Sequence, residues 1–552
     1  MMAGARLTGA RGWLAGAVGA AVSIAGVAAV SRIVGLGRTV TFARTVGATC
    51  LGDTYVTSNT VPNIIFEIVA GGALASLVVP VLAGPVVRGD RAEVSQTTSA
   101  LLSWALLIAA PVTALGAVFA RPLIGLLIGA TSRGCDRHVE LVVGARMLLV
   151  FMPQVVLYAL AVVLTGVLQA HRRFLAPAAA PLVSSVVVIG AYLLFHSLHG
   201  SGADIGQVSL SAELVLSVGT TLGVAALVAP MLFPAAKLGL RLRPTLRFPR
   251  SVGRRVAGLA AAGALTLAAQ QLSVAVVLRL AHRGDAGALV LYNLAWAVYL
   301  VPWSVVAVPI ATSAFPRLAA RGDSGDQAGY AAAASLGLRI VTVATAAAAA
   351  GLVVTSAPAA RVLVLRVPGN GDTTALAWTL AAFAPGLLGY GLVAYLGRAL
   401  YALQRWRFAA AAICGGWVVV IAADLALVPA FDARWRVVAL AIGNSIGMTV
   451  AGLALLVGVA RATRRRVLSG MARTAAGSLA GVIAGLAVGL AVVWLLGPHS
   501  AGVSVFVALV AGAVAIAVAV LVTMVVEPAS ERARLRSQLF GPLRLRGGES
   551  VG

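Results

Sequence analysis

Acidic and reactive side chains are scarce in this sequence. Only 17 of its 552 residues are Asp or Glu, six are His and three are Cys, and the single lysine is Lys237. The acids are mostly isolated, and no H-E-x-x-H motif, glycine-rich phosphate loop or Ser/His/Asp arrangement accompanies them. These absences argue against a hydrolase, a zinc enzyme or an ATP-driven pump. We expect a protein that is not an enzyme and has no bound cofactor.

Charge is also rare, and apolar residues take its place. Charged residues make up 11% of the chain and hydrophobic residues 60%, with a mean hydropathy of +0.98, which excludes a water-soluble globule. Apolar runs of about 20 residues, each long enough to cross a bilayer, recur along the whole length. We predict an all-α polytopic membrane protein with fourteen transmembrane helices near residues 14–44, 51–86, 95–119, 141–168, 175–197, 209–233, 254–281, 286–318, 331–356, 376–402, 408–430, 437–460, 474–497 and 502–526.

The net charge of +25 is distributed unevenly between the predicted loops. Arginines crowd into alternate loops and into the tail, whereas the loops 197–210 and 497–503 contain no Arg or Lys. This pattern follows the positive-inside rule and places both termini in the cytoplasm. We therefore expect a multi-pass protein of the cytoplasmic membrane that contacts anionic lipid rather than nucleic acid. No cleavable signal peptide is evident, so the first apolar run is interpreted as the first span.

The sequence contains an internal repeat. LLVFMPQVVLYAL (148–160) resembles LAAFAPGLLGYGL (380–392) at a shift of 232, and ASLVVPVLA (75–83) resembles ATSAFPRLA (311–319) at a shift of 236. Six predicted spans separate the copies, an even number, so the halves are parallel repeats, as in many transporters. We predict an N-lobe over 1–250, a C-lobe over 251–466, a C-terminal helix pair over 467–527 and a basic cytoplasmic tail over 528–552.

Two arginines lie inside the first predicted span, Arg32 and Arg38, on either side of Gly35 and Gly37. An arginine at bilayer depth costs several kcal/mol, so it normally faces a wet cavity. The glycines would let the helix bend so that both guanidinium groups meet one cavity, where they could bind a phosphate through paired hydrogen bonds. The alternative is that both reach a headgroup region or pair with a structural acid.

Three further features of the apolar segments concern single side chains. Glu67 lies in the middle of the second span, and we predict that it pairs with Arg38 or Arg32, either structurally or as a gate. Asp424, inside span 11, could bind a coupling cation or a proton, or could have a hydrogen-bonded structural role. Cys50 and Cys135 fall on predicted external loops, where a disulfide could form, but we expect unpaired thiols.

The segment SRIVGLGRTVTFARTVGATCLGDTYVTSNTVPNIIFEIVAGGALASLVVPVLA (31–83) resembles the first two spans of the MurJ (MviN) lipid II flippases, and MLFPAAKLGLRLRP (231–244) resembles the basic turn after their sixth span. The resemblance implies that Arg32 and Arg38 are cavity arginines and that Asp53 is the acid at the start of span 2. Three positions depart from the pattern. Thr39 replaces an Asp, Glu67 replaces an Arg, and Trp296 with Ala297 replaces an Asp-Arg pair. The F-E-I form of span 2 looks like actinobacterial members.

By this resemblance the protein would flip lipid II to the outer leaflet by alternating access for peptidoglycan synthesis. Arg32, Arg38, Asp53 and Glu67 would bind the headgroup, and a groove by spans 13 and 14 would hold the polyprenyl tail. Its partners would be the lipid-linked diphosphate sugar, membrane lipids and cell-wall synthesis and division proteins. The alternatives are export of another polyprenyl-linked glycan or amphiphilic natural product, and a non-transporting scaffold. Resetting would use either a cation at Asp424 or the membrane potential acting on the arginines.

Overall fold

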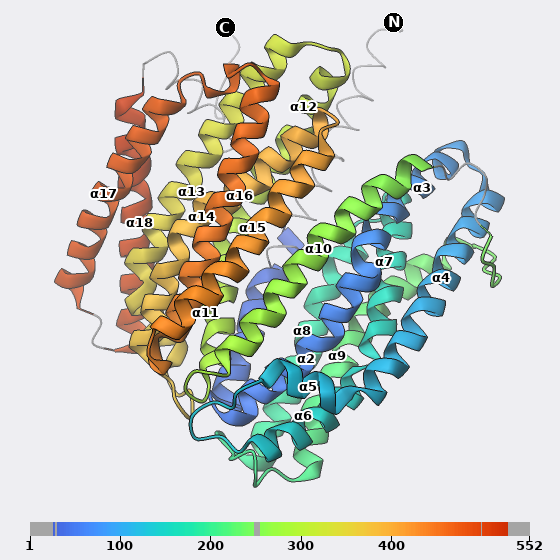
Figure 1. Ribbon diagram of the computed structural model, residues 1–552, viewed down its shortest axis with the longest axis vertical. Helices are drawn as coiled ribbons and strands as arrows, with labels where there is room; N and C mark the ends of the chain where they lie inside the picture. Colours follow the sequence, from blue (N-terminus) through green and yellow to red (C-terminus); the bar gives the residue numbers. More distant parts are fainter. Residues whose placement is uncertain (1–25, 28–29, 248–253, 498–499, 528–552) are drawn as a thin grey trace, which may run out of the picture. The chain divides into compact units, whose positions relative to one another are not determined.

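The fold consists of long α-helices, seen in a computed structural model that describes residues 26–27, 30–247, 254–497 and 500–527 (Figure 1). Besides these helices and their short 3-10 and π-helical extensions, the described part of the chain has one isolated β-bridge, between Ala48 and Gly369. The chain divides into two compact units. Unit 1 comprises residues up to His282 together with Val367–Asn370, and unit 2 comprises the remainder.

Unit 1 begins with a helix over 30–45. It continues with α2 (Cys50–Phe66), the π-helical segment η1 (Glu67–Gly71), α3 (Gly72–Arg88), α4 (Arg91–Val118), α5 (Ala120–Ile128), α6 (Arg137–Phe151), α7 (Gln154–Ala170), α8 (Leu175–His199), α9 (Leu210–Ala236) and α10 (Arg254–Ala281).

Unit 2 contains α11 (Ala288–Pro302), the π-helical segment η2 (Trp303–Ala307), α12 (Val308–Asp323), α13 (Gln327–Val364), α14 (Thr373–Ala402), α15 (Trp406–Leu427), the 3-10 turns η3 (Val428–Ala430) and η4 (Ala433–Trp435), α16 (Arg436–Ala462), the turn η5 (Arg466–Leu468), α17 (Met471–Leu496) and α18 (Ala501–Val526). Its centre is α13, an alanine-rich helix that is mostly buried and packs against α12, α14, α17 and α18. Small side chains allow this close approach of helices in a membrane.

Several of the few acids define where helices begin. Asp90, Asp136, Asp326 and Asp372 are the N-caps of α4, α6, α13 and α14, and each carboxylate accepts a backbone N–H of the first turn. An aspartate at this position satisfies donors that have no intrahelical partner and complements the helix dipole. These acids are therefore accounted for by helix initiation, which leaves few for other roles.

One interruption of the helices recurs in both halves at the predicted shift. In the first half, α2 ends at Phe66 and the π-helical segment Glu67–Gly71 precedes α3. In the second half, α11 ends at Pro302 and the π-helical segment Trp303–Ala307 precedes α12, each boundary 236 residues later. A π-helical turn is rare and costly in a helix, and it often marks a functional site. Its presence at matching positions confirms the repeat.

Twelve helices of the described chain are long and apolar enough to span a membrane. They correspond to the third through fourteenth predicted spans, so the all-α membrane fold is confirmed, although the count of fourteen is not. The beginning of the first predicted span and the basic tail 528–552 lie outside the described residues. The boundary between the two compact units lies after His282, whereas the predicted boundary between the lobes lies at residue 250. The reason is that α10 packs against α3 and η1 and thus belongs to unit 1.

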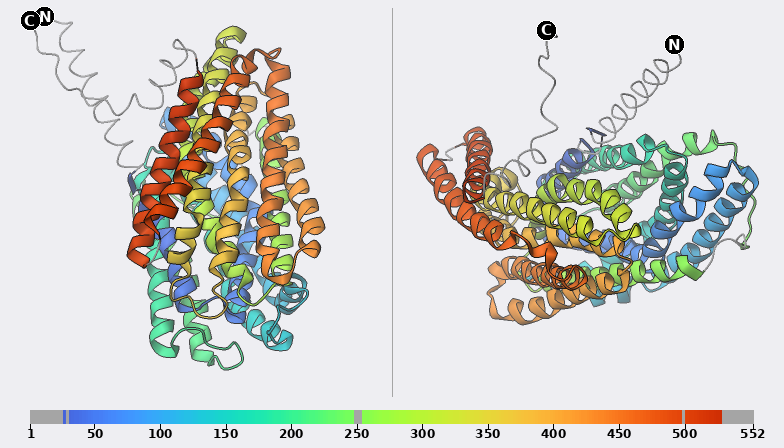
Figure 2. Two further views of the ribbon diagram at one scale, coloured as in Figure 1. Left: turned by 90° about the vertical axis from the view of Figure 1, so that its left-hand side faces the viewer. Right: turned by 90° about the horizontal axis from the view of Figure 1, so that it is seen from above.

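The helix pair α17–α18 packs along α13 in unit 2, as both views in Figure 2 show. Gly477, Gly481, Gly485 and Gly489 recur every fourth residue on α17 and form the seam of the pair. A Cβ at Gly485 would lie 2.6 Å from the carbonyl oxygen of Ala515 on α18. Only glycine permits this approach, which is the small-residue packing expected of membrane helices.

Candidate functional site

The first helix presents Arg32 and Arg38 in different surroundings. The helix continues as an α-helix through Gly35 and Gly37. Arg32 is exposed and has no ion pair among the described residues, whereas Arg38 is half-buried. The Ser31 hydroxyl anchors this end of the helix by donating to the carbonyl oxygen of Ala178 on α8, at 3.1 Å.

Arg38 lies near a cluster of tyrosines. Its charge interacts electrostatically with the hydroxyl groups of Tyr55 on α2, Tyr158 on α7 and Tyr192 on α8. The Tyr55 hydroxyl lies 2.9 Å from the Tyr192 hydroxyl and 2.5 Å from Oγ1 of Thr220. The cluster thus offers a guanidinium supported by hydroxyl groups from three helices, which is suitable chemistry for an anionic oxygen.

Glu67 lies at the start of η1 and is half-buried. Its charge acts on the Tyr158 hydroxyl, as does that of Arg38. The adjacent Phe66 ring packs on Tyr158 with 5.6 Å between ring centroids. Among the described residues, Glu67 does not form the predicted ion pair with Arg38 or Arg32. Tyr158 therefore lies within electrostatic range of both charges, and sequence reasoning had noted it only as a repeat position.

The repeat places a largely buried cluster of aromatic rings at the corresponding site of unit 2. Trp303 occupies the position equivalent to Glu67, and its ring stacks on Tyr390, the equivalent of Tyr158, at 4.7 Å between centroids. The cluster continues through Tyr299, Trp296, Phe383 and Tyr292. The helical spacing Tyr292, Trp296, Tyr299, Trp303 was a sequence signal for this cluster.

Asp53 is fully buried in the first turn of α2. It lies near Glu140 of α6 and interacts electrostatically with it. Asp53 therefore belongs to a closed acidic contact within unit 1 and not to an exposed face. Sequence reasoning did not single out Glu140.

The expectation of unpaired thiols at Cys50 and Cys135 is wrong. The two cysteines form a disulfide with their Cα atoms 5.7 Å apart. Cys50 is the first residue of α2, and Cys135 lies just before α6. Since α2 packs against α6, the fold brings the thiols together across 85 residues. This contact could not be read from the spacing of the cysteines.

Asp424 is fully buried on α15, and neither of its carboxylate oxygens has a hydrogen-bond partner in the described part of the chain. One oxygen packs directly on Gly443 of α16, and Tyr292 of α11 lies within electrostatic range. A buried carboxylate without donors is strongly disfavoured as an anion. No group of three or more His, Cys, Asp or Glu able to hold a metal is found in the described ranges.

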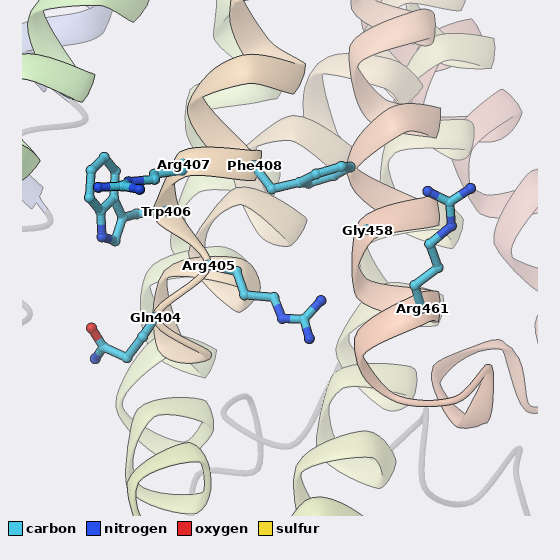
Figure 3. A pocket seen from close by; sticks show the side chains of 7 residues that line it. All are labelled: Gln404, Arg405, Trp406, Arg407, Phe408, Gly458 and Arg461. Atoms are coloured by element: carbon cyan, nitrogen blue, oxygen red, sulfur yellow. The ribbon is translucent and has the colours of Figure 1, made fainter.

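The cavities of unit 2 have basic walls. Figure 3 shows one of about 660 Å³, lined by Gln404, Arg405, Trp406, Arg407, Phe408, Gly458 and Arg461. A second, of about 810 Å³, lies between α12 and α13 and includes Arg317, Arg321, Arg339 and Arg466. Neither contains a residue that the sequence analysis assigned to the substrate. Most of these arginines lie at or near helix ends beside the basic loops, where anionic lipid headgroups are the expected neighbours, whereas Arg339 is buried on α13.

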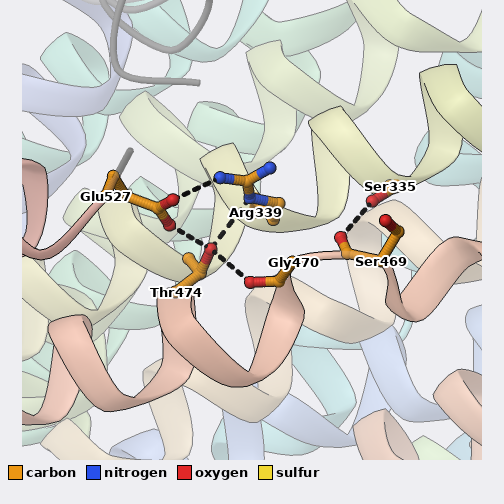
Figure 4. Close-up of polar contacts among 6 residues, drawn as sticks. All are labelled: Ser335, Arg339, Ser469, Gly470, Thr474 and Glu527. Atoms are coloured by element: carbon orange, nitrogen blue, oxygen red, sulfur yellow. Dashed lines mark hydrogen bonds and ion pairs between the residues drawn. The ribbon is translucent and has the colours of Figure 1, made fainter. Parts of the chain in front are cut away.

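A buried ion pair joins the C-terminal helix pair to α13 (Figure 4). Arg339 Nη2 lies 2.6 Å from Glu527 Oε2, and Arg339 Nε donates to Thr474 Oγ1 at 2.8 Å. Thr474 in turn donates to Glu527 Oε1 at 2.5 Å. The side chains of Arg339 and Glu527 are 5% and 1% exposed. Sequence reasoning assigned no role to either residue, which lie 188 positions apart.

Known proteins resemble this chain over most of its length. The family model described as lipid II flippase MurJ matches residues 42–519, a range that begins after Arg32 and Arg38. A protein of Burkholderia cenocepacia named lipid II flippase MurJ is 25% identical over 397 residues, covering 70% of this chain and 73% of the relative. A probable lipid II flippase MurJ of Rhizobium tropici is 26% identical over 388 residues, covering 69% and 70%.

Solved structures show the same fold. A lipid II flippase MurJ in an inward closed conformation matches with a TM-score of 0.67 at 18% identity, covering 95% of this chain and 99% of that chain. An inward-facing multidrug resistance MATE family transporter of the MOP superfamily matches with a TM-score of 0.62 at 14% identity, covering 80% and 95%. The predicted transporter architecture is confirmed.

Proposed function

Because the chain belongs to the MurJ family of lipid II flippases, whose model matches most of its length, we propose that it moves lipid II from the inner to the outer leaflet of the cytoplasmic membrane by alternating access. A sugar-diphosphate headgroup cannot cross hydrocarbon, whereas an apolar polyprenyl tail is readily solvated by it. The protein would shield the headgroup while the tail remains in lipid, and its work is transport rather than catalysis.

The arrangement around Arg38 is the observation that carries this proposal. Arg38 and Glu67, the latter at the start of the π-helical segment, both lie within electrostatic range of Tyr158, and the diphosphate would bind beside the Arg38 guanidinium. A guanidinium binds phosphate through a planar pair of hydrogen bonds. Arg32, exposed about two turns earlier on the same helix, would contact the headgroup as it enters. The buried Asp53 would help to position the helices around the site.

The proposal also covers the helices that contact the polyprenyl tail, the orientation of the termini and the protein partners. Lipid-facing side chains of α17 and α18, such as Leu479, Trp494 and Leu509, are apolar and exposed, and they suit contact with the tail. The arginine-rich loops favour cytoplasmic termini by the positive-inside rule. Cell-wall synthesis and division proteins are the partners that a supplier of external lipid II would meet.

Substitution of Arg38 tests the cargo. In proteoliposomes containing labelled lipid II, we expect Arg38→Ala to slow exposure of lipid II at the opposite leaflet about tenfold or more, because a hydrogen bond to a charged group contributes about 1.5–3 kcal/mol. Arg38→Lys should fall between the two, because lysine keeps the charge but lacks the fork. Arg88→Ala, which removes an exposed arginine bonded to Glu93, is the matched control.

Depletion in cells distinguishes the cargo from its alternatives. External labelling of lipid II should fall when the protein is lost and recover with the wild-type chain. Unchanged labelling would show that this family member carries another lipid-linked glycan. Full activity of an Arg32→Ala, Arg38→Ala double variant would instead support a scaffold that transports nothing.

We propose that Asp424 takes part in resetting the empty carrier by binding a cation or a proton. Its buried, undonated carboxylate supports this role, because such a group is stable only when its charge is compensated. Asp424→Asn should make transport in proteoliposomes insensitive to sodium or to pH, whichever drives the wild type. Equal rates and equal ion dependence in the two proteins would leave the membrane potential, at about 2.3 kcal/mol per charge per 100 mV, as the driving force.

A further inference from the structure

Glu140 on α6 is the second fully buried acid that has no hydrogen-bond donor. Its exposed fraction is 0%, and neither carboxylate oxygen has a hydrogen-bond partner among the described residues. The helices pack closely nearby, since α6 approaches α2 and α5 at Gly144, one turn further on. A Cβ at Gly144 would lie 3.0 Å from Cγ2 of Ile124 and 3.1 Å from Cγ2 of Thr54.

The charges around Glu140 make an anion still less favourable. Asp53 on α2, also 0% exposed, is the principal charge acting on it, and the exposed Arg137 and Asp136 at the start of its own helix oppose each other. On α9, Glu213 is occupied by an ion pair with Arg146 at 2.6 Å. The charged residues of the other neighbouring helices, α4 and α5, lie in their first turns and are Arg91, Glu93 and Arg121.

We propose that Glu140 is a proton-binding site, and that its bound proton stabilises the contact between α2 and α6. A buried carboxyl group without a donor is strongly disfavoured as an anion, and the charge of Asp53 within electrostatic range disfavours it further. A bound proton removes this cost and makes Glu140 a hydrogen-bond donor. The buried Thr54 hydroxyl lies beside Glu140, so its Oγ1 atom is the acceptor available to a protonated Glu140.

This site is separate from Asp424, which lies in the other unit. It also does not depend on the identity of the cargo. Because the packed form binds the proton more tightly than a form in which α2 and α6 have separated, the stability that it provides is present at low pH and is lost as pH rises. The α2–α6 contact is therefore predicted to be sensitive to alkaline pH.

The test uses the full chain reconstituted in lipid and the infrared carbonyl stretch of protonated carboxylic acids at neutral pH. We expect wild type to show a component of this band that is lost in Glu140→Gln and retained in the control Glu93→Gln, whose side chain forms an exposed ion pair with Arg88. In parallel, the thermal unfolding temperature of wild type should fall from mildly acidic to mildly alkaline pH, whereas that of Glu140→Gln should change less.

An identical infrared band in wild type and Glu140→Gln would overturn the proposal, since Glu140 would then be ionised. A wild-type unfolding temperature that depends on sodium rather than choline, with the dependence lost in Glu140→Gln, would also overturn it by identifying a metal cation in place of the proton. Should Glu140→Gln fail to fold, Glu140→Met provides the neutral side chain of similar length. None of these measurements requires lipid II, so the failure of this proposal and that of the transport function remain distinguishable.

Discussion

The charged side chains of this protein are few, and those that the helices bury differ in whether they form an ion pair. Arg339 and Glu527 are joined inside unit 2 with Thr474 between them. The pair Arg434–Asp372, by contrast, lies at the surface, with the arginine side chain 51% exposed. Burial alone would raise the pKa of Asp372, but hydrogen bonds from Arg434 and from two backbone N–H groups outweigh it and lower that pKa.

Removing one member of the buried pair should be costly. We expect Glu527→Ala to destabilise the protein by about 3–5 kcal/mol, because it leaves the Arg339 guanidinium buried without its counter-charge. The double variant Arg339→Met, Glu527→Leu should lie close to wild type, since it removes both charges. Thermal unfolding in detergent, together with proteolysis of the α17–α18 pair, measures the effect.

Arg434→Ala is the control for this experiment, and its effect on stability is expected to be much smaller, as is usual for exposed ion pairs. If Glu527→Ala unfolds no more easily than Arg434→Ala, the buried contact does not hold the C-terminal helices on α13.

At the scale of the elements, helix contacts within unit 1 bring together residues that are distant in sequence. The packing of α2 on α6 creates both the Cys50–Cys135 disulfide and the Asp53–Glu140 contact. The π-helical segments η1 and η2 interrupt equivalent helices in the two halves. Each half thus has one irregular helical turn beside a tyrosine, and in unit 1 a disulfide also fixes the start of α2.

The disulfide should stabilise the α2–α6 contact. Cys50→Ser is expected to lower stability by about 2–4 kcal/mol, because it releases a cross-link between residues 85 positions apart. Thiol labelling of the unreduced chain should detect Cys414, the cysteine that is free in the described structure, and Cys135 should become reactive in Cys50→Ser. Equal labelling of wild type with and without reductant would contradict the disulfide.

At the scale of the whole molecule, the parallel repeat explains why the two halves share geometry but differ in chemistry. Equivalent positions carry Glu67 beside Tyr158 in one half and Trp303 beside Tyr390 in the other. At this position the first half therefore has a charged side chain, and the second half has part of the buried aromatic cluster. A disulfide persists on the oxidising side of a membrane, so the Cys50 end of unit 1 is expected to be external, which agrees with the loop charges.

The sequence by itself determined the membrane class, the helices from the third span onward and the repeat. These features depend on local quantities, namely the length of apolar runs, capping aspartates and matching segments at one shift. The alternation of basic loops similarly predicts orientation without any knowledge of packing.

Only the tertiary structure decided which side chains meet. The sequence paired Glu67 with Arg38, but among the described residues the two form no ion pair, and both lie within electrostatic range of Tyr158. It also paired Cys50 with Cys135 and Arg339 with Glu527, and it set Glu140 beside Asp53. In soluble proteins the apolar face of a helix shows which side packs on the core, and the polar face shows which side meets water. Here the helices are apolar on every side because lipid replaces water, so their rotation and partners follow from close packing across long sequence separations.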